Sequence, residues 1–229
     1  STLFPYTTLF RSLKNKYGME EDDFLSAEIE VVPAGKARDF GLDRSMIMAY
    51  GQDDKVCAYS SLRAFLDCPP CSKTISCILV DKEEIGSMGA TGMMSTFYEN
   101  AILEMCNLMG HTENTALARC LTNSYMLSSD VNAAYDPLYS DVMDKRNSSY
   151  FNKGVVFCKY TGSRGKSGSN DANAEFVAKV RNIFESNNVK YQVSELGKVD
   201  LGGGGTIAYI LANKGMDVID CGVPIISMH

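Results

Sequence analysis

The sequence predicts an α/β protein in which a doubly wound, mostly parallel sheet is flanked by helices. Short apolar runs typical of buried strands alternate with stretches of helical period along most of the chain, and this alternation is typical of parallel sheets with helical crossovers. The chain has 229 residues, 45% of them hydrophobic, which is enough for one sizeable core and a small second domain. Ligands in such folds collect beyond the carboxyl ends of the strands.

Strands are expected where apolar or alternating runs end at turn residues. These runs are 24–32, 46–50, 74–80, 124–131, 154–160, 191–194, 218–220 and a last one within 222–229. Helices are expected where apolar residues recur at helical spacing. These stretches are 54–66 (with Asp54 as N-cap), 89–109, 112–121, 172–186 and 206–213. A polar insert at 137–152 and a Gly/Ser-rich loop at 162–169 interrupt the pattern.

Composition argues against several functions. The net charge of -6 and a pI of about 5.0 do not suit a general binder of nucleic acid or anionic membranes. No apolar run reaches the ~18 residues of a membrane span, and no signal peptide of the usual layout is present. Most of the eight cysteines lie in apolar patterns, which indicates free thiols in a reducing compartment. We therefore expect a cytoplasmic protein without nucleic-acid or membrane partners.

The first twelve residues are expected to be foreign to the protein. Residues 2–12, TLFPYTTLFRS, match the translation of a widely used short-read sequencing adapter, so residues 1–12 are excluded from the fold prediction. The chain also stops directly after an apolar run. We expect an internal fragment of a longer protein, truncated at both ends.

The paired carboxylates of Glu83 and Glu84 follow the expected strand 74–80. An isolated Glu-Glu pair is most often a solvated turn, since Glu is usually exposed. Here, however, Asp53, Asp130 and His229 also stand at or just past expected strand ends. Adjacent residues that leave a strand point to different sides, so one Glu can bind a metal while the other faces a bound water.

Carboxylates and imidazole are ligands for divalent metals. One ion could be bound by Glu84, His229 and a shared Asp53, and a second by Asp53 and Asp130. A water between the ions would become hydroxide near neutral pH, and Glu83 would remove its proton and deliver it to a leaving amine. The second ion needs another ligand. The only other histidine, His111, ends an expected helix and is better explained as an exposed C-terminal His.

Five motifs stand in order along the chain: GQDDKVCAY around Asp53, DKEEIGS, SSDVNAAYDP around Asp130, GGGGTIAYILA, and the closing GVPIISMH. Together they resemble the motif set of the aspartyl aminopeptidase and vacuolar aminopeptidase I family of dinuclear zinc metallopeptidases. The resemblance covers residues 24–229. It implies a zinc exopeptidase catalytic domain, in which the sheet carries the metal site.

Residue by residue, the resemblance implies that Asp53 bridges two zinc ions per intact subunit, although other divalent metals are possible. Glu83 matches the catalytic base, Glu84 and His229 match ligands of one ion, and Asp130 matches a ligand of the other. The reaction implied is hydrolysis of the N-terminal peptide bond of peptides. Histidines that often follow the Asp130 equivalent are absent from residues 132–136, which leaves the substrate preference open.

The resemblance also implies a domain organisation. Residues 13–50 correspond to the end of an inserted dimerisation domain and the return from it, and residues 51–229 to the catalytic domain. The family's first zinc histidine lies upstream of the insert, so this fragment lacks it and is expected to be inactive alone. The full-length protein is expected to form a homo-oligomer. Gly205, Thr206 and Lys159 are candidate substrate-binding residues.

Three alternatives remain open. A carboxypeptidase or deacylase of the same metal clan would share these ligands. A nucleotide-binding module is suggested by Gly165-Lys166-Ser167, but Tyr160 stands where a phosphate-binding loop needs Gly. A non-enzymatic homologue is the third. The pair Cys68-Pro-Pro-Cys71 is read as a plain loop, since no second pair exists for a zinc ribbon.

Overall fold

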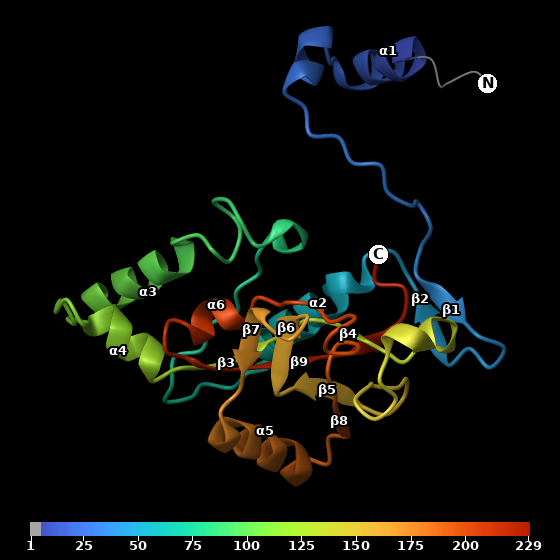
Figure 1. The fold of residues 1–229 in the computed structure, drawn as a ribbon. Helices are drawn as coiled ribbons and strands as arrows, with labels where there is room; N and C mark the ends of the chain where they lie inside the picture. The colour runs from blue at the N-terminus through green and yellow to red at the C-terminus, as the bar shows by residue number, and fades with distance from the viewer. Residues whose placement is uncertain (1–5) are drawn as a thin grey trace. The chain divides into compact units, whose positions relative to one another are not determined.

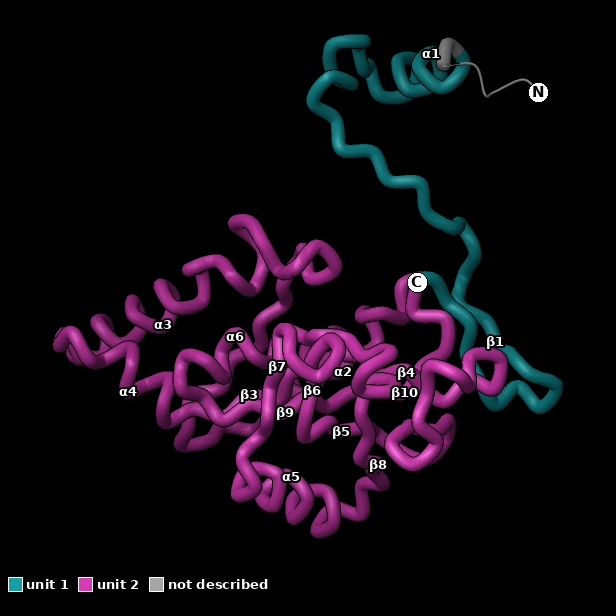
Figure 2. Tube along the Cα trace, viewed as in Figure 1, with its two compact units in different colours: residues 1–50 teal, residues 51–229 magenta. Residues whose placement is uncertain are grey.

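The computed structural model describes residues 6–229, which divide after Tyr50 into two compact units (Figure 2). Residues 1–5 of the segment expected to be foreign lie outside the described residues. Residues 6–12 of that segment belong to helix α1, Tyr6–Tyr17. No helix in the described range is both long and apolar enough to cross a membrane.

The first unit contains α1, a 3-10 helix at Glu21–Leu25, and an antiparallel hairpin of β1, Arg38–Phe40, and β2, Met46–Met48. The hairpin confirms a strand within 46–50. The strand expected at 24–32 is wrong, because residues 26–37 have no regular structure. Leu25 and Val31 are 85% and 96% exposed, so the alternating pattern there does not bury an apolar face.

The second unit is built on a four-stranded sheet in the order β3-β9-β5-β8. The strands are β3, Tyr125–Ser128; β9, Asp217–Gly222; β5, Val155–Cys158; and β8, Tyr191–Val193. β3 runs parallel to β9, and β5 parallel to β8, while β5 and β9 are antiparallel. The sheet is therefore mostly parallel, as predicted.

Helices cover both faces of this sheet (Figure 1). On one face α5, Ala174–Ser186, packs Phe176 and Val180 against Phe157 and Ile219. On the other, α6, Ala208–Ala212, contributes Ala208 and Leu211 to a core cluster with Val218 of β9. Apolar residues at helical spacing in α5 and continuous apolar runs in β5 and β9 explain why these elements are buried together.

The remaining elements surround the sheet. They are α2, Gln52–Asp67; a 3-10 helix, Glu83–Ile85; α3, Phe97–Leu108; α4, Ala116–Thr122; β4, Asn132–Ala133; a 3-10 helix, Pro137–Val142; β6, Tyr160–Ser163; β7, Ser167–Asp171; and β10, Pro224–Ile225. β4 pairs parallel with β10, and β6 forms an antiparallel hairpin with β7.

Three predicted elements differ from the structure. Residues 74–80 are not a strand: no described strand pairs with them, and Leu79 is 58% exposed. Residues 162–169 are not a loop but the β6–β7 hairpin, in which a Cβ on Gly162 would lie 2.4 Å from Ser169 Oγ, so glycine permits the close pairing. The helix expected from residue 89 begins at Phe97, because Gly92 sits in a tight turn where a Cβ would lie 2.2 Å from the Ser87 carbonyl oxygen.

Candidate metal centre

Asp53 and Asp54 lie at the start of α2, where the backbone of both residues departs from helical geometry. The regular helix begins after them, with the amide of Lys55 bonded to the carbonyl oxygen of Gly51. Gly51, with φ of 72°, precedes α2, and Asp54 immediately precedes the regular part of the helix, which is the position that the sequence predicted for the N-cap. Oδ1 of Asp54 has no hydrogen-bond partner among the described residues, so this oxygen is available to the site.

Asp53, Glu84 and His229 form the first group of possible metal ligands, with one donor atom from each within 4.8 Å of the others. Nε2 of His229 lies 3.4 Å from Oδ2 of Asp53 and 3.4 Å from Oε1 of Glu84. Glu84 belongs to the one-turn helix at 83–85, whose flanking residues Lys82 and Gly86 both have left-handed backbones. The backbone therefore turns on both sides of Glu83 and Glu84, directly after the irregular segment 74–80.

Asp53, Asp54 and Asp130 form the second group, also with donor atoms within 4.8 Å of one another. Asp130 lies in the short connection between β3 and β4. Its carbonyl oxygen packs directly on the end of β9, where a Cβ on Gly222 would come within 1.6 Å of it. Only glycine allows this close approach, so Gly222 helps to position Asp130.

The carboxylates of the two groups repel one another and are partly removed from water. Burial, followed by the charges of Asp54, Asp53 and Glu83, raises the pKa of Asp130 to about 8. Burial raises the pKa of Asp54 to about 6, and the charge of Asp53 adds to this effect. The pKa of Asp53 is also raised, by burial and then by Glu84, although His229 opposes the shift.

Glu83 is partly buried beside this cluster. Burial raises its pKa, and the charges of Glu84 and Asp53 raise it further, while His229 lowers it. Glu83 is in neither group of mutually close donor atoms, although it interacts with members of both. A carboxylate next to a metal centre, with a pKa shifted toward neutrality, is chemically suited to exchange protons.

The donor set fits divalent metal ions. Oδ1 of Asp54 is buried without a hydrogen-bond partner among the described residues, and clustered carboxylates with raised pKa values indicate missing positive charge. Carboxylate oxygens with one imidazole suit zinc. Since Asp53 belongs to both groups, one carboxylate could contact two ions.

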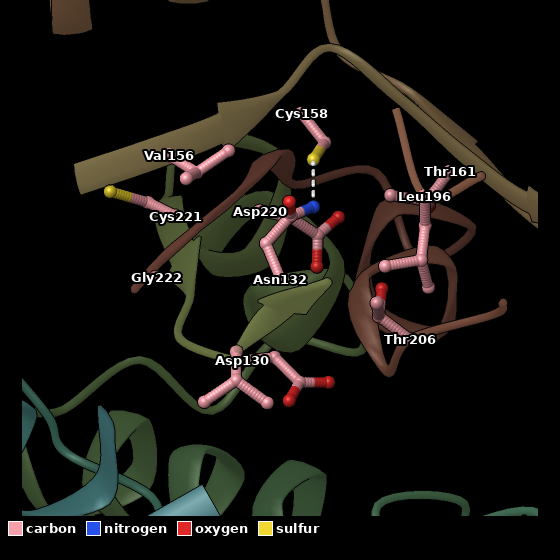
Figure 3. Close-up of a pocket in the computed structure, with 11 residues that line it drawn as sticks. Asp130, Asn132, Val156, Cys158, Thr161, Leu196, Thr206, Asp220, Cys221 and Gly222 are labelled. Carbon is pink, nitrogen blue, oxygen red and sulfur yellow. Dashed lines mark hydrogen bonds between the residues drawn. The ribbon is translucent and has the colours of Figure 1, made fainter. Parts of the chain in front are cut away.

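The other candidate residues lie in different places. Thr206 lines a pocket together with Asp130 (Figure 3), and Gly205 precedes it in the segment that leads to α6. Lys159 forms an ion pair with Asp171. His111 has an exposed side chain 3.9 Å from Glu113 and is in neither ligand group.

Two acidic residues near the centre were missed by the sequence argument. Asp54 was assigned to helix capping, although the doublet Asp53-Asp54 mirrors the doublet Glu83-Glu84. Asp220 was treated only as part of a strand, although an acidic residue within an apolar strand is an unusual signal. It is 5% exposed in β9, and both its carboxylate oxygens lack hydrogen-bond partners in the described part of the chain.

The motifs that suggested other functions are explained by the fold. Gly165-Lys166-Ser167 lies at the turn of the β6–β7 hairpin and is followed by a strand, whereas a phosphate-binding loop leads into a helix. All eight cysteines are free thiols. Cys68 and Cys71 are exposed and follow the end of α2, as expected of a plain loop.

Comparison with known proteins identifies the family. Residues 6–229 match the family model described as aminopeptidase I zinc metalloprotease (M18). A probable M18 family aminopeptidase 1 from Clostridium acetobutylicum is 59% identical over 96% of this chain and 48% of its own length. One from Thermotoga maritima is 49% identical over 97% of this chain and 49% of its own. The chain therefore spans about half the length of these curated relatives.

Solved structures agree. The crystal structure of aminopeptidase I from Clostridium acetobutylicum superimposes with a TM-score of 0.87 and 58% identity, over 96% of this chain and 47% of that one. That of the Thermotoga maritima M18 aminopeptidase has a TM-score of 0.91, 49% identity, and coverage of 97% and 50%. The S. cerevisiae mApe1 dodecamer shares the fold at a TM-score of 0.70 and 22% identity, over 97% of this chain and 49% of that one. By family model, sequence and fold, the chain belongs to the M18 family of aminopeptidase I zinc metalloproteases.

Proposed function

We propose that the protein containing this chain removes the N-terminal residue of peptides at a centre that binds two zinc ions. The observation that carries this proposal is the position of Asp53, which is a member of both ligand groups. Asp53 would contact both ions, Glu84 and His229 would bind one, and Asp130 the other. When bound, zinc supplies positive charge that lowers the pKa of water and polarises a peptide carbonyl.

Glu83 is the proposed general base. It accepts a proton from the attacking water and transfers it to the nitrogen that leaves when the peptide C–N bond breaks. Burial and the charges of Glu84 and Asp53 raise its pKa, which makes it a stronger base than an ordinary carboxylate, and a base in this role must accept the proton and then give it up. Glu84, the next residue along the backbone, keeps its carboxylate for metal.

The substrate contacts follow from the surroundings of the centre. The free N-terminal amine of a peptide is cationic and would be attracted by the cluster of Asp53, Asp54 and Asp130. Gly205 and Thr206 would hydrogen-bond to the peptide backbone. Lys159 would contact a substrate only after it leaves its ion pair with Asp171.

The proposed domain organisation follows the division after Tyr50. Residues 51–229 contain Asp53, Glu84, Asp130 and His229 and form part of a catalytic domain, and residues 13–50 correspond to the end of an inserted dimerisation domain. We infer that the second ion also needs a histidine from the part of the relatives' length that this chain does not span. The 229-residue chain would then be inactive alone, and the full-length protein would be a cytoplasmic homo-oligomer, like the dodecameric yeast protein of this fold.

A substrate panel tests this proposal on the full-length protein. The zinc-supplied protein is incubated with aminoacyl anilides, N-acetylated amino acids and peptides with a blocked N-terminus. We expect it to release the N-terminal residue from the substrates that have a free amine. Glu83→Gln should retain zinc and lose most activity, while Glu104→Gln, an exposed residue of α3, serves as the matched control. Cleavage of acylated substrates alone, or normal turnover by Glu83→Gln, would refute the assignment.

A further inference from the structure

Polar side chains stand side by side in the middle of the central sheet. The strand register pairs Ser128 of β3 with Asp220 of β9, and Asp220 with Cys158 of β5. Residues paired in this way project to the same face of a sheet. Ser128 is 0% exposed, and Asp220 and Cys158 are each 5% exposed. An acidic side chain therefore lies within the face that packs toward Thr161 and Thr206.

Several oxygens at this position lack partners. Both carboxylate oxygens of Asp220, Oγ of Ser128 and Oγ1 of Thr161 are buried without a well-formed hydrogen bond among the described residues, although the Thr206 and Ser128 hydroxyls lie close enough to Asp220 to oppose the rise in its pKa that burial causes. Buried polar groups are nearly always paired, and an uncompensated buried carboxylate is especially unfavourable. Three of these atoms belong to Asp220 and Thr161, which line one cavity, and this indicates that an occupant completes the site.

A small cavity lies at this point. Asp220, Thr161 and Thr206 line it, together with Asp130, Asn132, Cys158, Leu196 and others, and its volume is about 20 Å³. Figure 3 shows the Asp220 carboxylate directed into the cavity, toward the side formed by Leu196, Thr161 and Thr206. A cavity of this volume holds a single occupant about the size of water.

The donor atoms select the kind of occupant. Carboxylate and hydroxyl oxygens are hard ligands that suit alkali and alkaline-earth cations. Mg²⁺ keeps several of its waters and does not fit a space for one occupant, and the double charge of Ca²⁺ would exceed that of the Asp220 carboxylate. One carboxylate balances a single positive charge, and a neutral water would leave that charge uncompensated.

We propose that this cavity binds one monovalent alkali cation between the Asp220 carboxylate and the hydroxyls of Thr161 and Thr206, which line it. Asp220 is not a member of either group of candidate zinc ligands, so this is a separate site. Asp130 lines the cavity and also belongs to the second ligand group. A cation bound here would therefore stabilise the fold beside the zinc centre without replacing zinc.

Thermal unfolding of the full-length protein tests the proposal. The protein is treated with chelator and dialysed into KCl, NaCl or choline chloride at equal concentration. We expect KCl or NaCl to raise the Tm by about 3 °C or more over choline chloride, since a ligand that binds only the folded state stabilises it. The shift should be lost in Asp220→Asn and retained in Asp200→Asn, which removes an exposed carboxylate.

Thr161→Val provides a second test if Asp220→Asn does not fold. This substitution removes one hydroxyl ligand and nearly preserves the shape of the side chain. The rise in Tm produced by KCl or NaCl should therefore be smaller. Equal Tm values for the wild-type protein in all three salts would overturn the proposal and assign the cavity to a water or a proton. An undiminished shift in Asp220→Asn, or in Thr161→Val where only that variant folds, would overturn it as well.

Discussion

Nε2 of His229 lies 3.4 Å from Oδ2 of Asp53, although one residue opens the second unit and the other stands at its far end in the sequence. The parallel pairing of β10 with β4 brings the segment before His229 beside the segment after Asp130. Strand pairing therefore brings His229 of the first ligand group close to the segment that carries Asp130 of the second.

His229→Ala should lower the zinc content of the full-length protein by removing the only nitrogen donor of the first group. His111→Ala is a matched control, since His111 is exposed and lies beside Glu113, outside the centre. Zinc bound after dialysis, measured by atomic absorption, should fall by about one ion per subunit in His229→Ala and not in the control. Equal loss in both variants would contradict the ligand assignment.

Asp54→Asn should weaken zinc binding by about 10- to 100-fold, which is the usual effect of removing a group that supports metal ligands. Its carboxylate lies within 4.8 Å of donor atoms of Asp53 and Asp130, and the change removes its negative charge while keeping its size. Competition with a chromophoric chelator measures the affinity. Unchanged affinity would show that Asp54 serves helix α2 alone.

Gly222→Ala should displace Asp130 and reduce zinc affinity together with stability. The added methyl would meet the Asp130 carbonyl oxygen at 1.6 Å and Sγ of Cys57 at 3.2 Å, so the backbone has to move. Gly35→Ala is the control, because its methyl would meet only Arg38, at 3.7 Å. Chelator competition and Tm measurements on both variants check this expectation, and wild-type zinc affinity in Gly222→Ala would disprove it.

Metal removal should make the protein less stable as the pH rises. In the metal-free folded state the pKa of Asp130 is about 8 and that of Asp54 about 6, against 3.8 for the ordinary carboxyl. Between about pH 4 and pH 8 the folded state retains protons on these two carboxyls that the unfolded state has released, and this proton binding stabilises the folded state. The stabilisation is complete below about pH 4 and is lost as the pH rises to about 8.

The measurement is Tm against pH in chelator and in saturating zinc. We expect the Tm in chelator to fall from pH 5 to pH 8. The fall should correspond to a loss of about a few kcal/mol in the free energy of unfolding. Zinc should oppose this trend, because it displaces the protons that the free carboxylates retain. Asp130→Asn should remove most of the slope in chelator, and an unchanged slope would assign it to other groups.

The sequence predicted the fold class and the position of Asp130 just past a strand because both depend on local patterns, whereas the strand expected before Glu84 does not form. α5 and β9 are marked by strong apolar periodicity, and Asp53, Glu84, Asp130 and His229 stand where strands or apolar runs stop. The structure brings these four residues into two overlapping groups. Their roles in metal binding remain a prediction.

Other features depend on distant partners and could not be read locally. Residues 74–80 have the composition of a strand, but a strand also needs a neighbour with which to pair. The hairpin at 160–171 looked like a loop, because Gly and Ser are poor strand formers whose small size matters only when the strands approach closely. The apolar run around Asp220 makes this acidic residue unusual, but only the register reveals Ser128 and Cys158 beside it.

The order of the ligands along the chain has a consequence for biosynthesis. A ribosome makes Asp53 first, then Glu84 and Asp130, and His229 only after β9 and β10 are complete. At ~5–20 residues per second, a nascent chain carries the acidic ligands for several seconds before the imidazole exists. The first ligand group is therefore complete only after β9 and β10 have been synthesised, and until then its acidic members lack their imidazole neighbour.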